Sequence, residues 1–152
     1  AQNRNIAASH LNVNYISFID ADDIMYAKRL EILVKVINEY NTDIILHNYS
    51  TINVEMANMD DELIIDDSSL IKSPSGCITH KYYDDTIYKI HHSQPTVKYN
   101  IWKYNKFSEE ISHIGIEDCV FCYRIFNISN IKHIYIANEL TYYKQSFTNS
   151  IH

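Results

Sequence analysis

The spacing of apolar and polar residues along the chain predicts strands and helices in alternation. Residues 15–19 form a near-continuous apolar, aromatic and β-branched run, which is typical of a strand buried on both faces. Apolar residues then recur at helical spacing from about 26 to 40, and a second strand, centred on Ile44-Ile45-Leu46, covers 43–50. The face of this helix that we expect to be buried carries Leu30, Leu33, Ile37 and Tyr40. Strand, helix and strand in this order favour an α/β fold.

Weaker patterns fill the rest of the chain. We expect short helices over 4–11 and 117–127 and a short strand over 134–136. Residues 55–75 are polar, acidic and irregular, and the last dozen residues have the composition of a loop. There are no repeats, and no linker divides the chain, so the pattern predicts a single domain.

Composition narrows the class of protein. The 152 residues suffice for one hydrophobic core, and 46% apolar with 21% charged residues is ordinary for a soluble globular protein. A net charge of −6 without a basic run argues against nucleic acid as a partner. No apolar stretch reaches the roughly 18 residues that span a bilayer, and no signal peptide is evident. Three cysteines, an odd number, favour reduced thiols and a cytoplasmic location.

The strongest chemical feature is the acidic cluster Asp20-Ala21-Asp22-Asp23, directly after the first predicted strand. In open α/β sheets, ligands bind at the carboxyl ends of the strands. Carboxylates at that place can hold a divalent cation, and hard oxygen ligands suit Mg²⁺ or Mn²⁺. Such a cation would neutralise a diphosphate and stabilise it as a leaving group.

Other interpretations of the acidic cluster differ in strength. Asp22 or Asp23 could merely cap the helix that follows. An EF-hand would need an oxygen ligand at Ile24 and a glycine at Met25, so it is excluded. A phosphatase with Asp20 as its nucleophile would resemble the haloacid-dehalogenase family. That family has a small or hydroxyl residue where Asp23 and Ile24 stand, which weakens this alternative but leaves it open.

Four segments carry motifs in a consistent order. They are Arg4-Asn5 at a helix start, YISFIDADD over 15–23 with the helix start at 28–31, residues 107–125 around Gly115-Ile116-Glu117-Asp118, and the tyrosine-rich residues 139–151. Together they resemble family 2 glycosyltransferases of the GT-A fold, from residue 3 to the end, with a poorly matched middle from about 52 to 95. The resemblance implies an α/β, GT-A-like mixed sheet flanked by helices.

The resemblance also implies how the single domain 1–152 is organised. Residues 1–51 would form the metal and nucleotide side, 52–105 a variable acceptor side, and 106–152 the segment with the catalytic base and a closing loop. The family's opening strand–helix–strand unit, which holds the nucleobase, should precede Arg4. We therefore expect an N-terminally incomplete domain.

The activity implied by the resemblance is an inverting hexosyltransferase of polysaccharide biosynthesis. Its donor would be a nucleoside-diphosphate sugar, most simply a UDP-sugar, with Mn²⁺ or Mg²⁺ as cofactor. Its acceptor would be a hydroxyl of a glycan or a lipid-linked acceptor, which allows peripheral membrane association. By the same resemblance, Asp118 is the catalytic base, Asp22 and Asp20 ligate the metal, and Arg4 and Asp20 face the nucleotide.

Several further residues have both a functional and a purely structural interpretation. Trp102 and Lys103, with Glu117, fall on the implied acceptor side, although a lone tryptophan is more often part of a core. Glu117 and Asp118 also suit a helix N-terminus, which favours acidic residues. Gln145 and Ser146 stand where several family members place a further metal-ligating histidine. A non-catalytic fragment that serves as an interaction module therefore remains an alternative.

Overall fold

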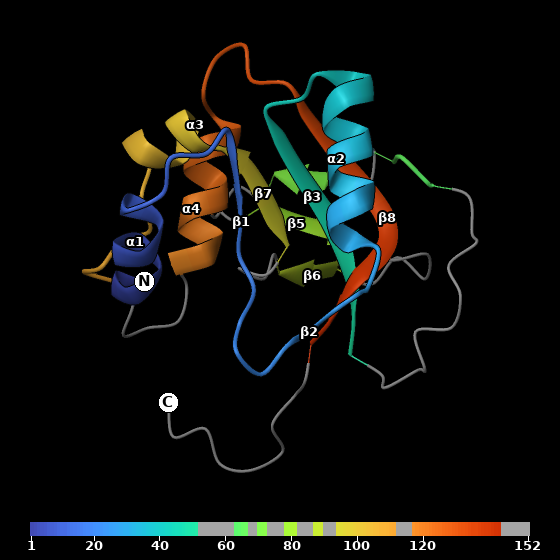
Figure 1. The fold of residues 1–152 in the computed structure, drawn as a ribbon, viewed down its shortest axis with the longest axis horizontal. Helices are drawn as coiled ribbons and strands as arrows, with labels where there is room; N and C mark the ends of the chain where they lie inside the picture. The colour runs from blue at the N-terminus through green and yellow to red at the C-terminus, as the bar shows by residue number, and fades with distance from the viewer. Residues whose placement is uncertain are drawn as a thin grey trace.

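A five-stranded mixed sheet forms the centre of the protein (Figure 1). The computed structural model describes residues 1–51, 63–66, 70–72, 78–81, 87–89, 94–111 and 117–143. The order of the strands across the sheet is β1-β7-β3-β8-β2. Their bounds are β1 Tyr15–Ser17, β2 Ile24–Met25, β3 Ile44–Ser50, β7 Pro95–Lys98 and β8 His133–Tyr142. The helices are α1 Gln2–Ser9, α2 Arg29–Tyr40, α3 Tyr99–Tyr104 and α4 Glu117–Phe126.

The direction of the strands decides where the chain leaves the sheet. β3 and β8 are parallel, whereas β7 is antiparallel to both of its neighbours, β1 and β3. β1 therefore runs in the same direction as β3 and β8. The carboxyl ends of these three strands lie at one edge of the sheet, the lower edge in Figure 1. The acidic cluster follows β1 at this edge.

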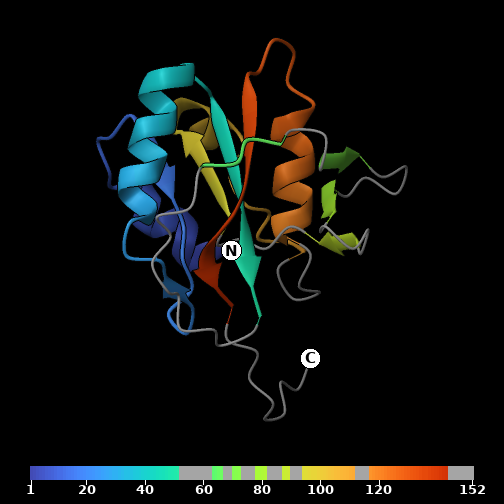
Figure 2. The ribbon, with the colours of Figure 1, turned by 90° about the vertical axis from the view of Figure 1, so that its right-hand side faces the viewer.

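Helices pack on both faces of the sheet. Figure 2 shows α2 on one face and α4 on the other. Beyond α4 lies a small antiparallel sheet of β4 Leu70–Lys72, β5 Ile78–Lys81 and β6 Ile87–Lys89. The side chains of β3 alternate between the two faces, with Ile44 and Leu46 in the core shared with α4 and Ile45 in the core shared with α2. All seven residues of β3 are buried, as expected of a central strand covered on both sides.

The strongest patterns in the sequence are confirmed. The structure places a helix at Gln2–Ser9 where 4–11 was expected, a strand at Ile44–Ser50, and a helix at Glu117–Phe126. The strand predicted at 15–19 is present as β1, but its expected burial on both faces is wrong. Ile16 and Phe18 are buried, whereas Ile19 is 42% exposed. Ile19 lies beyond Ser17, the last residue of β1, where the chain has left the sheet.

Tertiary pairing overrides the local pattern at two places. β1 and β3 are not neighbours in the sheet, because β7 from the weakly patterned middle of the chain inserts between them. The strand predicted at 134–136 is ten residues long, because β8 pairs with β3 on one side and with β2 on the other. Part of the predicted C-terminal loop is therefore strand. Residues 55–75, expected to be irregular, include β4.

The second helix starts later than expected. Its predicted start, at about 26, is wrong because Ile24–Met25 pairs with β8 and the Tyr26 N–H donates to the Leu140 carbonyl at 3.1 Å. Leu30, expected on the buried face, is 54% exposed, whereas Arg29 is only 1% exposed. The helix is thus rotated so that a cation, rather than a leucine, faces the interior at its first turn.

Candidate functional site

The acidic cluster forms a turn directly after β1. The Asp23 N–H donates to the Asp20 carbonyl at 3.1 Å, which closes the turn. Asp20 and Asp23 are partly exposed, and Asp22 is exposed. We call residues Asp20–Asp23 the acidic turn. The alternative in which Asp22 or Asp23 caps the next helix is wrong, because α2 begins at Arg29 and Lys28 occupies its N-cap position.

Arg4 connects the acidic turn to the start of α4. Its Nη2 lies 2.5 Å from Asp20 Oδ1, and its Nη1 lies 3.6 Å from Glu117 Oε1. The guanidinium carbon is 5.9 Å from the centroid of the Phe107 ring, within range of a cation–π contact. One cation from α1 thus holds two carboxylates that are far apart in the sequence, which brings three predicted site residues together.

Asn5, the neighbour of Arg4, anchors α1 to the segment before α4. Its Nδ2 donates to the Phe107 carbonyl at 2.9 Å and to Glu109 Oε1 at 3.0 Å, and its Oδ1 accepts from the Phe107 N–H at 3.1 Å. Asn5 is 4% exposed. These bonds satisfy both backbone groups of Phe107 and so fix the position of Arg4 relative to α4.

We expect Asn5→Ala to destabilise the fold by about 3 kcal/mol, because it leaves two buried backbone groups of Phe107 without partners. Urea unfolding, followed by circular dichroism, measures this change. Asn127→Ala is the matched control, since Asn127 is exposed and its amide donates only to the Tyr123 carbonyl. The control should change the free energy of unfolding by less than about 1 kcal/mol. Equal effects of the two substitutions would contradict the anchoring role.

Asp118 lies in the first turn of α4, where its Oδ1 accepts from the Cys119 N–H at 2.8 Å. It is partly buried. A carboxylate at this place is stabilised by the helix N-terminus whether or not it has a catalytic role. This local hydrogen bond explains the presence of a carboxylate at the start of α4.

The hydroxyl of Tyr143 is affected by carboxylates of both the acidic turn and α4. Tyr143 directly follows β8, and its N–H donates to the Ser50 carbonyl at 2.8 Å. Burial raises the pKa of the Tyr143 hydroxyl above its usual range, and four carboxylates raise it further. These are Asp23, Asp22, Asp20 and Asp118. Carboxylates of both the acidic turn and Asp118 thus act on one phenol. The ion pairs of Arg4 with Asp20 and with Glu117, the residue before Asp118, link the two segments directly.

Sequence reasoning gave no site role to Tyr143 or to Arg29. Tyr143 was only part of a tyrosine-rich motif, and Arg29 only part of a helix match. The Arg29 guanidinium donates to three neutral oxygens near the acidic turn, those of Thr141 (2.9 Å), Ser17 (2.7 Å) and the Phe18 carbonyl (3.0 Å). Burial lowers the pKa of Arg29 to about 10 and Asp23 opposes this, so the side chain is a cation at neutral pH. No pattern in the sequence marks a buried arginine.

The donor atoms of the acidic turn fit a hard divalent cation. Within the described part of the chain, no three His, Cys, Asp or Glu side chains gather around one point as a complete metal cage would require. Mg²⁺, however, is commonly held by one or two carboxylates together with substrate phosphates. Asp22 makes no hydrogen bond or ion pair with another described residue, and Asp20 lies beside it in the turn. Gln145, Ser146 and His152 lie outside the described residues.

The residues expected on the acceptor side have different environments. Trp102 is fully buried in the core that α4 shares with the sheet, so a sugar has no access to its ring in this fold. Its burial agrees with the interpretation of Trp102 as a core residue. Lys103 is exposed, and Glu117 is part of the ion-pair network of Arg4. Cys119 and Cys122 are buried thiols, and burial raises the pKa of Cys122 well above its usual value.

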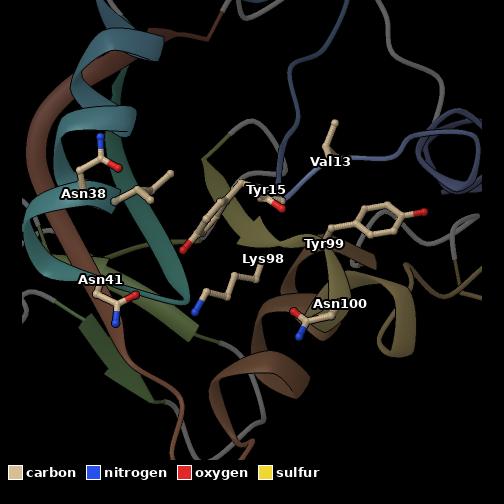
Figure 3. Close-up of a pocket in the computed structure, with 9 residues that line it drawn as sticks. Val13, Tyr15, Asn38, Asn41, Lys98, Tyr99 and Asn100 are labelled. Atoms are coloured by element: carbon tan, nitrogen blue, oxygen red, sulfur yellow. The ribbon is translucent and has the colours of Figure 1, made fainter.

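A separate cavity of about 710 Å³ lies around the first residues of β1. Figure 3 shows Asn38 of α2 and Asn41, the C-cap of that helix, on one side of it, Tyr99 and Asn100 of α3 on the other, and Lys98 between them. Lys98 is paired with Asp43 at 2.6 Å. The cavity contains neither the acidic turn nor Asp118, which lie at the opposite ends of the strands. It is therefore not part of the predicted site.

No helix in the described ranges is long and apolar enough to cross a membrane. Comparison with curated protein sequences gave no match.

Several solved structures with a similar fold are of one protein, S. aureus TarS. The crystal structure of S. aureus TarS 1–349 superposes with a TM-score of 0.64 at 18% identity, covering 94% of this chain and 39% of that one. TarS 1–349 in complex with UDP gives 0.62 at 17% identity, covering 95% and 40%. The complex with UDP-GlcNAc gives 0.58 at 14% identity, covering 96% and 39%. The chain thus spans about two fifths of the TarS fragment and shares the GT-A fold of its glycosyltransferase domain.

The sequence itself identifies the family. The model of glycosyl transferase family 2 matches residues 1–134, which include α1, the acidic turn and the whole of α4. The match covers all the described residues that meet at the carboxyl edge of the sheet except those at the end of β8. This chain therefore belongs to glycosyl transferase family 2.

Proposed function

We propose that this domain carries the metal site and the catalytic base of an inverting glycosyltransferase that transfers a sugar from a UDP-sugar. The observation that supports this most directly is the pair of ion pairs by which Arg4 links Asp20 of the acidic turn to Glu117, the residue before Asp118. Nucleotide-dependent transfer needs a place for a cation and a separate proton acceptor. The acidic turn would hold the cation and Asp118 would accept the proton, and these residues lie on different segments at the carboxyl edge of the sheet.

On the donor side, Asp22 and Asp20 would hold Mn²⁺ or Mg²⁺. The bound cation would neutralise the charge that develops on the departing diphosphate. Arg4 is placed to add a second positive charge and to orient Asp20, with which it is already paired. The TarS complexes contain UDP and UDP-GlcNAc, which supports a uridine nucleotide as the donor carrier for this chain.

On the acceptor side, Asp118 would act as the general base. Its carboxylate takes the proton of the acceptor hydroxyl while the oxygen forms a bond to the anomeric carbon. The bond from that carbon to the diphosphate oxygen breaks, and its electron pair leaves with the diphosphate. Inversion requires the base and the leaving group on opposite sides of the sugar. Placement of Asp118 on α4 and of the acidic turn after β1 is compatible with that requirement.

The acceptor we propose is a hydroxyl of a glycan or a lipid-linked acceptor, in polysaccharide biosynthesis. Lys103 is exposed near the start of the base segment and would contribute to its binding. The buried thiols of Cys119 and Cys122 favour the reducing cytoplasm, where the protein could associate with a membrane surface. Among the earlier alternatives, family membership favours a transferase over the phosphatase, and the inert interaction module is separated by the following test.

Calorimetric titration tests the proposal. We expect UDP to bind the chain saturably in the presence of Mn²⁺, and the heat to disappear when EDTA removes the metal, because the diphosphate completes the cation's coordination. GDP in place of UDP, titrated into the full-length protein, tests the choice of nucleobase. Absence of saturable heat with either nucleotide would overturn the proposed function for this chain and favour the interaction module.

A further inference from the structure

We propose that Arg29 is a positioning residue that holds the acidic turn in its metal-binding conformation and ties it to the end of β8. This inference rests on the proposed metal–diphosphate site. It concerns a residue that contacts neither the metal nor the nucleotide in that proposal.

Arg29 occupies an unusual place for a charged side chain. It is the first residue of α2 and is 1% exposed, among the largest fully buried side chains of the described structure. Burying a guanidinium is unfavourable unless its N–H groups find acceptors in fixed positions. A leucine or methionine would fill the space without this desolvation cost, so packing alone does not explain a cation at this place.

The acceptors of Arg29 lie on the two segments that leave the sheet at the site. Nη2 donates to the Phe18 carbonyl at 3.0 Å, and Phe18 is two residues before Asp20. The same nitrogen donates to Ser17 Oγ at 2.7 Å, which also accepts from Thr96 Oγ1 at 2.9 Å. These contacts fix the direction in which the chain enters the acidic turn.

Nη1 makes the connection to β8. It donates to Thr141 Oγ1 at 2.9 Å, and Thr141 is 1% exposed and pairs with Met25 of β2. Thr141 is two residues before Tyr143, the phenol that lies within reach of the carboxylates of the site. One planar guanidinium with donors in a rigid fork thus joins the residues before the acidic turn to the residues before Tyr143. A lysine has a single flexible ammonium and cannot reproduce this geometry.

Electrostatic repulsion within the acidic turn explains why a nearby buried cation would stabilise it. Three aspartates within four residues repel one another, and the turn would spread apart without positive charge nearby. Arg4 is partly exposed and pairs with Asp20 directly, whereas Arg29 acts from the buried side and attracts Asp23. Residues that orient the ligands of a metal typically contribute 10- to 100-fold to its affinity.

The test compares Arg29→Lys with the native chain by calorimetric titration of Mn²⁺ and UDP. Lysine keeps the positive charge but lacks the planar set of N–H donors of arginine. A weaker affinity therefore reports on the geometry of the hydrogen bonds rather than on net charge. We expect the affinity for Mn²⁺–UDP to fall by about tenfold. Arg124→Lys is the matched control, because Arg124 is exposed in the last turn of α4, and it should bind as the native chain does.

A second variant covers the case in which Arg29→Lys does not fold. Thr141→Val removes one acceptor of the guanidinium and keeps the size and strand preference of the side chain. We expect it to fold and to weaken Mn²⁺–UDP binding by a smaller factor, about threefold. Native affinity in both variants, or in Thr141→Val alone if Arg29→Lys is unfolded, overturns the inference. A lower melting temperature with unchanged affinity also overturns it. If the native chain itself binds no Mn²⁺–UDP, the proposed function fails instead.

Discussion

Replacing Asp118 with asparagine should reduce sugar transfer by the full-length protein by about 100- to 10,000-fold, the usual loss when a general base is removed. The amide cannot take the proton of the acceptor hydroxyl at neutral pH. It can still accept from the Cys119 N–H through its oxygen, so the start of α4 should remain intact. The rate of UDP release in the presence of acceptor measures the effect.

A binding measurement and a control variant accompany Asp118→Asn. Binding of UDP with Mn²⁺ should be close to native, because Asp118 lies on α4 and the metal is assigned to the acidic turn. Glu110→Gln is a suitable control, since Glu110 is an exposed carboxylate in the segment before α4. If Asp118→Asn keeps a rate within tenfold of the native protein, Asp118 is not the base and its role is the helix start alone.

Replacing Asp22 with alanine should lower the affinity for UDP in the presence of Mn²⁺ by about 100-fold or more, because it removes a charged ligand of the cation. Sugar transfer should be lost with it. Asp22 is exposed and makes no hydrogen bond or ion pair with another described residue, so the fold should be unaffected. Calorimetric titration with Mn²⁺ and UDP measures the change directly.

Glu31→Ala provides the comparison for Asp22→Ala. Glu31 is an exposed acidic residue in the first turn of α2, a few residues beyond the acidic turn. The substitution Glu31→Ala removes one negative charge from the same region without changing a proposed ligand. The variant should therefore bind Mn²⁺ and UDP as the native chain does. Equal losses in both variants would mean that bulk charge, rather than ligation by Asp22, governs the affinity.

The parts of the fold that could be predicted are those determined by neighbouring residues. The run 43–50 is centred on Ile44-Ile45-Leu46, and β3 is buried on both faces. The helical spacing after Glu117 produces α4, because its apolar residues meet the core at every turn. The acidic turn could be predicted for a similar reason, since polar residues directly after an apolar strand lie at the edge of a sheet. The family motifs then connected that edge to Asp118.

The residues around the site could be predicted only in part. Arg4 and Asp20 were both expected to face the nucleotide, and an ion pair joins them. The ion pair of Arg4 with Glu117, which was expected on the acceptor side, was not predicted. The burial of Arg29 and the position of Tyr143 near the carboxylates of the site were not expected from local pattern. A buried arginine looks like any surface arginine in a sequence, because its acceptors at Ser17, Phe18 and Thr141 come from other strands.

The sequence by itself determined the α/β class, the central strand β3, helix α4, the family, and the position of the acidic turn, because each depends on residues that are close together in the chain. Only the tertiary structure decided that β7 lies between β1 and β3, that β8 extends to Tyr142, and that Arg29 rather than Leu30 is buried. These features depend on hydrogen bonds between distant segments. Such partners exist only once the chain has folded, and they bring the acidic turn, Asp118 and Tyr143 to one edge of the sheet.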